Sequence, residues 1–448
     1  MPSWREAPLP SPVTLLIILL VGAGFGLTLF VFYPGIMTYD ARYVYNAIAE
    51  GRVGDWQSPA MTALWALIDP IAPGAASMFL LIAALYWLAF AVLAFTTARH
   101  SRRLALALPL LALAPPAFEF VGIIWRDILF ADVWLLAAAL AYAGALQAAS
   151  VRVPMQALAL GLFVLGLLLR PNALLAAPIL CAYILSPSRL CWKFLALAYV
   201  PAVVALYALV SVMYYGVFDA MRQNPLHSIL VFDLGGITHV TKRNQFPVTF
   251  TPEQTALVTD HCYSPELWDV YWTRDPCRFV MARLEGEKTF GSPLLVDAWR
   301  RAVMQHPVAY LQHRLTFMAT FLAGANRTLW TQDLDDPSQM IFADRSAFLA
   351  LKAVDASLKA TPLLRSGSWL LVCAVVCAFA WQRRDTKSGA FALAVCGSAA
   401  VYVMTFLAVG VAADFRYALW SVLAGLTGTV AAAVSNRCVV DASAPHPT

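Results

Sequence analysis

Long apolar runs, separated by short polar loops, recur along most of this 448-residue chain. Charged residues are rare inside the runs, and a helix that crosses a bilayer needs about 20 predominantly apolar residues. The pattern therefore predicts an all-α polytopic membrane protein with about ten to twelve transmembrane helices. The predicted spans are Val13–Tyr33, Ala75–Ala98, Leu104–Phe120, Ile128–Gln147, Met155–Leu169, Ala173–Leu185, Phe194–Tyr214, Ser366–Trp381, Ala390–Val409 and Phe415–Val434.

The apolar stretch from Met155 to Leu185 is interpreted as two short helices. Arg170-Pro171-Asn172 interrupts it, and a proline removes a backbone donor and disfavours helix at the preceding residue. Two later segments are ambiguous, because Tyr310–Gly324 is apolar whereas Ser346–Leu364 carries three charged residues. Either both cross the membrane, giving about twelve helices, or both lie along it or dip into it, giving about ten. The charges favour ten.

The basic loops predict how the chain is oriented. Arg99-His100-Ser101-Arg102-Arg103 is the densest short basic loop, so it is assigned to the cytoplasm. Counting membrane crossings from this loop predicts that both chain ends are cytoplasmic as well. The segments Pro34–Gly74, Gly122–Asp127 and Gly216–Arg365 are then extracytoplasmic. The chain thus divides into an N-terminal transmembrane module (1–214), an extracytoplasmic lobe with helices that dip into the membrane (215–365), and C-terminal transmembrane helices with a tail (366–448).

Composition narrows the function classes. Only 13% of the residues are charged, against about 25% in soluble domains, and the mean hydropathy is +0.68. The net charge of +5 is explained by the basic loops, so we expect membrane lipids and no nucleic acid as partners. The sequence has no glycine-rich phosphate loop, no Gly-x-Ser-x-Gly elbow and no cysteine–histidine zinc signature. A cytoplasmic enzyme that uses nucleotides is therefore unsupported.

Two of the eight cysteines, Cys262 and Cys277, lie together in the longest polar stretch. If that stretch is extracytoplasmic, they can form a disulfide that stabilises the fold by about 3 kcal/mol. The alternative is a free pair.

The first extracytoplasmic segment carries the most informative charges. Asp40 stands shortly after the first span, and the amphipathic stretch Ala41–Glu50 follows it. A carboxylate at the membrane surface can deprotonate the hydroxyl or amine of an acceptor, and Arg42 can bind a phosphate through paired hydrogen bonds. The alternative is that Asp40 only caps the helix, since aspartate is a favoured N-cap.

Further charges lie beside the predicted spans, where they are costly and tend to be functional. Arg126 and Asp127 follow a tryptophan in the second extracytoplasmic loop, and plain interfacial anchoring is the alternative for them. Arg170 at the predicted helix break needs either a lipid phosphate or a carboxylate such as Asp127 as partner. Arg416-Tyr417 opens the last span, where an ordinary interfacial belt is again the alternative.

This layout resembles the GT-C superfamily of membrane glycosyltransferases, which includes the protein O-mannosyltransferases and the lipid A aminoarabinose transferases. The resemblance rests on the acid followed by Arg-Tyr in the first outer loop, the interfacial helix and the proline-led apolar helix Ala60–Ile68. It implies an inverting enzyme of the bacterial plasma membrane that uses a polyprenyl-phosphate-linked sugar. The acceptor is then a glycolipid, a polysaccharide or a protein. The resemblance implies Asp40 as catalytic base, Asp127 as second acid, and Arg42, Tyr43, Arg416 and Tyr417 as contacts to the carrier phosphate, to which the charge pattern adds Arg126 and Arg170.

One position departs from the family pattern. Many members carry lysine or histidine just before the proline of the first loop, where this chain has Gln57-Ser58-Pro59. Gln57 and Ser58 are therefore candidates for contacts to the acceptor. The departure weakens the expectation of a bound divalent cation, which we leave open, and assigns more of the phosphate binding to arginines.

Two other functions fit the topology. An O-antigen polymerase or ligase would rely on arginines of the long outer loop, and a transporter or flippase would move lipid without changing it. The two halves of the chain show no clear internal repeat, which transporters often have. The loop arginines of the first alternative are Arg274, Arg278, Arg283, Arg300 and Arg301.

Overall fold

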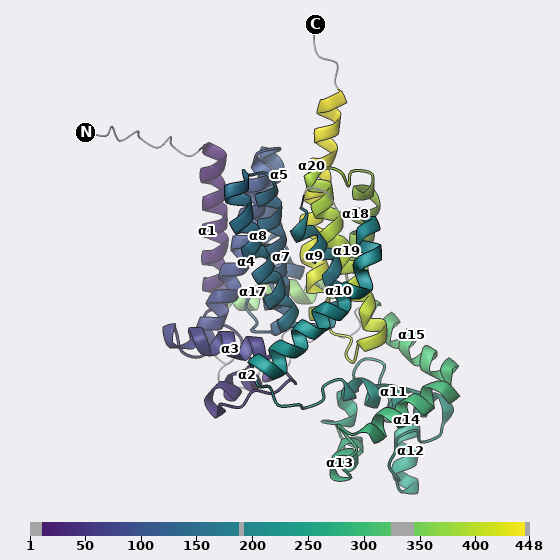
Figure 1. Cartoon of the computed structure of the whole chain (residues 1–448). Helices are drawn as coiled ribbons and strands as arrows, with labels where there is room; N and C mark the ends of the chain where they lie inside the picture. Colours follow the sequence, from purple (N-terminus) through teal and green to yellow (C-terminus); the bar gives the residue numbers. More distant parts are fainter. Residues whose placement is uncertain (1–10, 188–191, 324–344, 444–448) are drawn as a thin grey trace, which may run out of the picture.

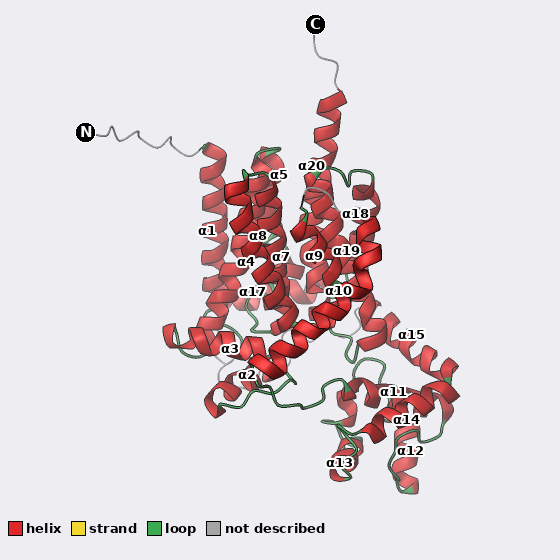
Figure 2. Ribbon diagram, viewed as in Figure 1, coloured by secondary structure: helices red, strands yellow, loops and turns green. Residues whose placement is uncertain are grey.

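The computed structural model describes residues 11–187, 192–323 and 345–443, and this part of the chain is helical without any β-strand (Figure 2). The helices with their bounds are α1 Pro12–Phe32, α2 Tyr39–Glu50, α3 Pro59–Ile68, α4 Ala75–Ala98, α5 Arg102–Leu111, α6 Pro115–Phe118, α7 Arg126–Ala145, α8 Ala149–Leu169, α9 Ala177–Leu185, α10 Trp192–Val212, α11 His227–Thr241, α12 Pro252–Asp260, α13 Phe279–Gly286, α14 Pro293–Gln305, α15 Pro307–Ala323, α17 Ser346–Leu358, α18 Ser366–Trp381, α19 Lys387–Val409 and α20 Leu419–Ser443.

Seven of the described helices are long and apolar enough to cross a membrane: α1, α4, α7, α8, α10, α19 and α20. Their outward faces are apolar as well, as on α10, where Leu197 is 82% exposed and Val200 and Val204 are also open. An apolar surface of this kind is stable against lipid and not against water. The fold is therefore that of an all-α membrane protein.

Three predicted spans form shorter helices, α5, α9 and α18, within the same bundle (Figure 1). The prediction of one continuous helix over Leu104–Phe120 is wrong, because α5 ends at Leu111 and α6 starts only at Pro115. Pro115 explains the break, since the residue before a proline is disfavoured in a helix, and Pro115 itself opens the new helix α6. The predicted break at Arg170 is confirmed, and α8 ends at Leu169.

The helix α7 lies at the centre of the bundle. It packs against α8, α4 and α20, and it is buried along almost its whole length. Its first turn carries Arg126 and Asp127, so the position of these charges is determined by the best-packed element of the fold.

A group of helices, α11 to α14, lies outside the bundle and is joined to it through α15 (Figure 1). We call this group the lobe and the adjacent end of the bundle the lobe end. The short helices α2 and α3 also lie at the lobe end, whereas α1 begins and α20 finishes at the opposite end. Arg99 to Arg103 connect α4 to α5 at that opposite end, since α4 leads back from the lobe end. The start of α1, the end of α20 and the densest basic loop thus share one end of the bundle.

Candidate functional site

Four segments that are far apart in the sequence bring acids and arginines together at the lobe end. Asp40 comes from α2, Asp127 from the start of α7, Arg170 from the residue after α8, and Arg416 from the 3-10 turn before α20. Arg416 Nη1 lies 2.8 Å from Asp40 Oδ2, and Arg170 Nε lies 2.6 Å from Asp127 Oδ1. Arg416 Nε also lies 4.0 Å from Asp127 Oδ2, so this arginine connects the two acids.

Asp40 does not cap its helix. The N-cap of α2 is Thr38, and the Asp40 carboxylate is turned toward Arg416 and toward Gln57, whose Nε2 donates a hydrogen bond to Oδ1 at 3.0 Å. The capping interpretation is therefore wrong. Partial burial raises the pKa of this carboxyl, but Arg416 and Arg126 outweigh that effect and hold the pKa below its ordinary value. Asp40 is consequently ionised at neutral pH, and its side chain is still 33% exposed.

Arg170 takes a carboxylate as its partner, which is one of the two partners expected from the sequence. Besides Asp127, its Nε has the Tyr402 hydroxyl at 3.3 Å, and its guanidinium lies 4.7 Å from the centre of the Tyr417 ring. Both members of the Arg170–Asp127 pair are almost fully enclosed. This pair therefore ties α7 and α8 to the last two helices.

Arg126 is held differently. Its Nη1 donates one hydrogen bond to the backbone oxygen of Trp56 at 3.2 Å, and within the described residues no carboxylate lies within 4.0 Å of its guanidinium. The positive charge of Arg170 repels it, and the negative charges of Asp127 and Asp40 attract it. A guanidinium has five N–H donors, so Arg126 retains capacity for a further acceptor at the lobe end.

Aromatic residues and a third acid fix Arg416. Its guanidinium lies 4.5 Å from the Trp125 ring centre, its Nη2 donates to the Tyr417 hydroxyl at 3.1 Å, and its Nε lies 3.3 Å from Asp414 Oδ2. Trp125 in turn donates from Nε1 to the Thr38 hydroxyl at 2.7 Å, just before α2. Several contacts thus orient the guanidinium of Arg416.

Short backbone pairings hold the loops that carry these residues. The amide of Ile36 donates to the oxygen of Gly122 at 2.8 Å, and the amide of Ile124 donates to the oxygen of Ile36 at 3.0 Å. This pairing sets the loop before Asp40 against the loop before α7. Gly35 is needed there because its φ is +105° and an added Cβ would lie 2.6 Å from Phe79 Cβ.

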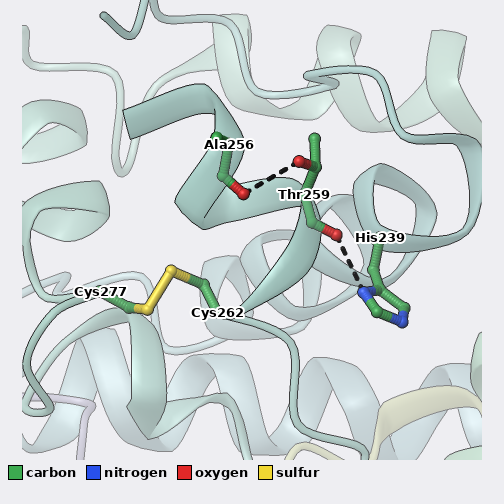
Figure 3. Close-up of a disulfide and its surroundings, with 5 residues drawn as sticks. All are labelled: His239, Ala256, Thr259, Cys262 and Cys277. Atoms are coloured by element: carbon green, nitrogen blue, oxygen red, sulfur yellow. Dashed lines mark hydrogen bonds between the residues drawn. A yellow bond between two sulfur atoms is a disulfide. The ribbon is translucent and has the colours of Figure 1, made fainter. Parts of the chain in front are cut away.

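Backbone hydrogen bonds also hold the lobe against the site. The amide of Trp268 donates to the oxygen of Val411 at 2.9 Å, and the amide of Ala413 donates to the oxygen of Glu266 at 2.6 Å. The loop of the lobe that contains Trp268 therefore docks onto the segment that leads directly to Asp414 and Arg416. A disulfide between Cys262 and Cys277, with Cα atoms 5.5 Å apart, closes this loop (Figure 3).

The structure does not bring all of the predicted residues into this network. Tyr43 accepts a hydrogen bond at its hydroxyl from Gln223 Nε2 at 2.7 Å. Ser58 caps α3 and donates to the oxygen of Leu168 at 2.9 Å, so its hydroxyl has structural partners. Arg42 is half-buried on α2, and the ion pair of Asp40 within the described residues is with Arg416 instead.

The arginines of the alternative polymerase or ligase hypothesis lie in the lobe segment of the chain, and some of them pair with nearby acids. Arg278 pairs with Asp275 at 2.8 Å and Arg283 with Glu287 at 2.8 Å, both at strongly exposed positions. These two pairs are separate from the Asp40–Arg416 pair.

The donor set at the lobe end does not fit a divalent cation. Asp40 and Asp127 are each paired with an arginine, and no group of three histidines, cysteines or acids that could hold a metal occurs in the described part of the chain. We therefore derive no step through a metal.

Sequence reasoning missed Asp269, which belongs to the docked loop of the lobe. Burial raises the pKa of its carboxyl, and it feels the charges of Arg416 and Asp40. The only signal in the sequence is that it follows Trp268 in an aromatic stretch of the outer segment. Tyr402 was missed as well, because it lies inside an apolar span and has no local motif.

Comparison of the chain with known protein-family models, curated proteins and solved structures finds no match.

Proposed function

We propose that this protein is a glycosyltransferase that moves a sugar from a polyprenyl-phosphate carrier to an acceptor on the extracytoplasmic side of the membrane. An accessible, ionised acid beside several arginines at one end of an apolar bundle supports this proposal. The densest basic loop lies at the opposite end of the bundle, which supports an extracytoplasmic position for the lobe end.

The observation that carries the proposal is the combination of Asp40 and Arg126. Arg126 has unused N–H donors beside an acid that is paired elsewhere, and such a guanidinium suits the charged oxygens of a phosphate. A purely structural arginine would be expected to have its own carboxylate, as Arg170 has in Asp127.

The chemistry is a single displacement. The acceptor oxygen or nitrogen attacks the anomeric carbon of the carrier-linked sugar, and the bond from that carbon to the phosphate oxygen breaks. Asp40 takes the proton of the acceptor, while Arg126 neutralises the charge of the leaving carrier phosphate. No nucleotide is needed, which agrees with the absence of a nucleotide motif in the sequence.

Arg416 links the binding of the donor phosphate to the basicity of Asp40. While it pairs with Asp40 at 2.8 Å, the carboxylate is a weak base. A phosphate that draws Arg416 toward itself removes this partner, and the pKa of Asp40 then rises because its carboxylate has lost a neighbouring positive charge. Binding of the donor therefore prepares the base.

The test is sugar transfer by the purified protein in lipid nanodiscs, with polyprenyl-phosphate-linked sugars as donors. Asp40→Asn should reduce transfer by about 10²- to 10⁴-fold, which is the usual contribution of a general base. Glu50→Gln is the matched control, because Glu50 lies on the same helix but at an exposed position beside Arg52. Full activity of Asp40→Asn contradicts the proposal.

A further inference from the structure

Three tryptophans meet where the first loop of the bundle touches the lobe. The ring of Trp56 lies 5.9 Å from that of Trp268 and 5.3 Å from that of Trp272, and the last two are 5.6 Å apart, measured between ring centres. Trp268 is buried, whereas Trp272 is 37% exposed. The group therefore has an enclosed side that joins the lobe to the bundle and an accessible side at Trp272.

This group is directly connected to the charged site. The backbone oxygen of Trp56 accepts the hydrogen bond of Arg126, and Asp269 lies in the same short turn as Trp268 and Trp272. Asp269 is half-buried, and its carboxylate interacts electrostatically with Arg416 and Asp40. It makes no hydrogen bond or ion pair with any described residue. A carboxylate in that position has unused acceptor sites.

An accessible indole and an unused carboxylate suit one class of ligand in particular. A pyranose ring has an apolar C–H face, which packs on an aromatic ring, and hydroxyl groups at its edge, which donate to a carboxylate. We propose that Trp272 and Asp269, supported by Trp56 and Trp268, form a subsite for a neutral pyranose ring of a substrate. This inference rests on the proposed function, and it names the part of the site that binds sugar.

The ring can come from a saccharide acceptor or from the carrier-linked donor. Kinetics separate the two sources, because Trp272→Ala should raise the KM for only one substrate, by about 3- to 10-fold for the loss of one aromatic contact. A higher KM for the acceptor assigns the ring to the acceptor, and a higher KM for the donor assigns it to the carrier-linked sugar. In both cases kcat should change little.

The deciding experiment does not depend on transfer. Methyl α-D-mannopyranoside, methyl β-D-glucopyranoside and methyl β-D-galactopyranoside are tested for saturation-transfer NMR signals with the full-length protein in nanodiscs. We expect a signal with the wild type for at least one glycoside, its loss in Trp272→Ala, and its retention in Trp272→Phe. Trp381→Ala is the matched control, since Trp381 is 46% exposed and lies on α18.

An equal signal in the wild type and Trp272→Ala, or no signal in either, overturns the subsite. Equal thermal unfolding midpoints of the wild type and Trp272→Ala exclude a folding defect as the cause of a lost signal. The proposed function fails separately, if Asp40→Asn transfers sugar at the wild-type rate while Trp272→Ala still loses the glycoside signal.

Discussion

Two groups of aspartate and arginine lie near the junction of the bundle and the lobe, and they differ in how completely the protein encloses them. In the lobe, Asp233 Oδ1 lies 2.6 Å from Arg314 Nε and 3.4 Å from His313 Nε2, and Oδ2 accepts a hydrogen bond from Trp299 at 2.7 Å. Arg314 also donates to the oxygen of Gly410 at 2.7 Å, at the end of α19. At the lobe end of the bundle, Asp40 pairs with Arg416.

The group around Asp233, which we call the sealed group, is almost completely enclosed by the protein. The side chain of Asp233 is 0% exposed, and burial lowers the pKa of His313 even though Asp233 beside it acts in the opposite direction. The Asp40 group is open, since its acid is partly exposed and Arg126 nearby has unused donors. The comparison leads us to propose that the same residue types stabilise the fold where they are enclosed, and bind a substrate where they are accessible and incompletely paired.

The sealed group should give the largest loss of stability. Asp233→Asn leaves Arg314 as a buried cation without a charged partner at Asp233, and breaking such a pair lowers the free energy of unfolding by about 3 to 5 kcal/mol. Unfolding in mixed detergent micelles measures the change. Asp260→Asn is the control, because the Asp260–Lys242 pair is exposed to solvent and should contribute little to stability. Equal effects of the two variants would remove the distinction between enclosed and open pairs.

Substitution of Arg126, in the open group, should instead lower activity without lowering stability. Arg126→Gln removes the unused donors and should reduce transfer by about 10²- to 10³-fold, as expected for a group that stabilises the charge of the transition state. Arg126→Lys should recover part of the activity, because it restores the charge but not the planar set of donors. Transfer rates and unfolding midpoints, measured on the same preparations, test this. A large fall in the midpoint of Arg126→Gln with little change in rate would assign Arg126 to the fold.

Loss of the disulfide should loosen the attachment of the lobe and leave the pairing of the bundle loops unchanged. Replacing both Cys262 and Cys277 with serine opens a loop of 15-residue separation, which costs about 3 kcal/mol by loop entropy. Hydrogen exchange should then accelerate at the amides of Trp268 and Ala413, which join the lobe to the bundle. The amide of Ile124, bonded to Ile36, is the internal control and should stay protected. Unchanged protection at Trp268 would mean that the docked loop is held without the disulfide.

The smallest effect concerns pH. Because the pKa of Asp40 lies below its ordinary value, its ion pair stabilises the folded state above the unfolded-state pKa of about 3.9. That contribution disappears as the pH falls through the lower, folded-state pKa. The difference in unfolding midpoint between the wild type and Asp40→Asn should thus stay constant down to about pH 5 and shrink only below about pH 4. A difference that disappears already at neutral pH would contradict the ion pair with Arg416.

Local patterns in the sequence were sufficient for much of the fold. Apolar length predicted the long helices, Pro171 predicted the break at Arg170, and the amphipathic stretch after Asp40 predicted α2. These features depend on neighbouring residues only. The end of α5 at Leu111 was missed, because apolar length was given more weight than the two prolines that follow.

The partners within the site could not be read from the sequence. Asp40 and Arg416 are 376 positions apart, and no local pattern links them. The docking of the lobe loop onto Val411 and Ala413 depends on backbone groups, which every residue type has. Arg126 stood out as a charge beside a span, but only the tertiary structure distinguishes it from the fully paired Arg170.

A density map of the protein in nanodiscs with bound polyprenyl phosphate tests the central claim most directly. We predict that the phosphate lies within hydrogen-bonding distance of Arg126 and that Arg416 moves from Asp40 toward it, leaving the carboxylate free to act as a base. A phosphate bound away from Arg126, or an Asp40–Arg416 pair that is unchanged when the phosphate is bound, would contradict the account.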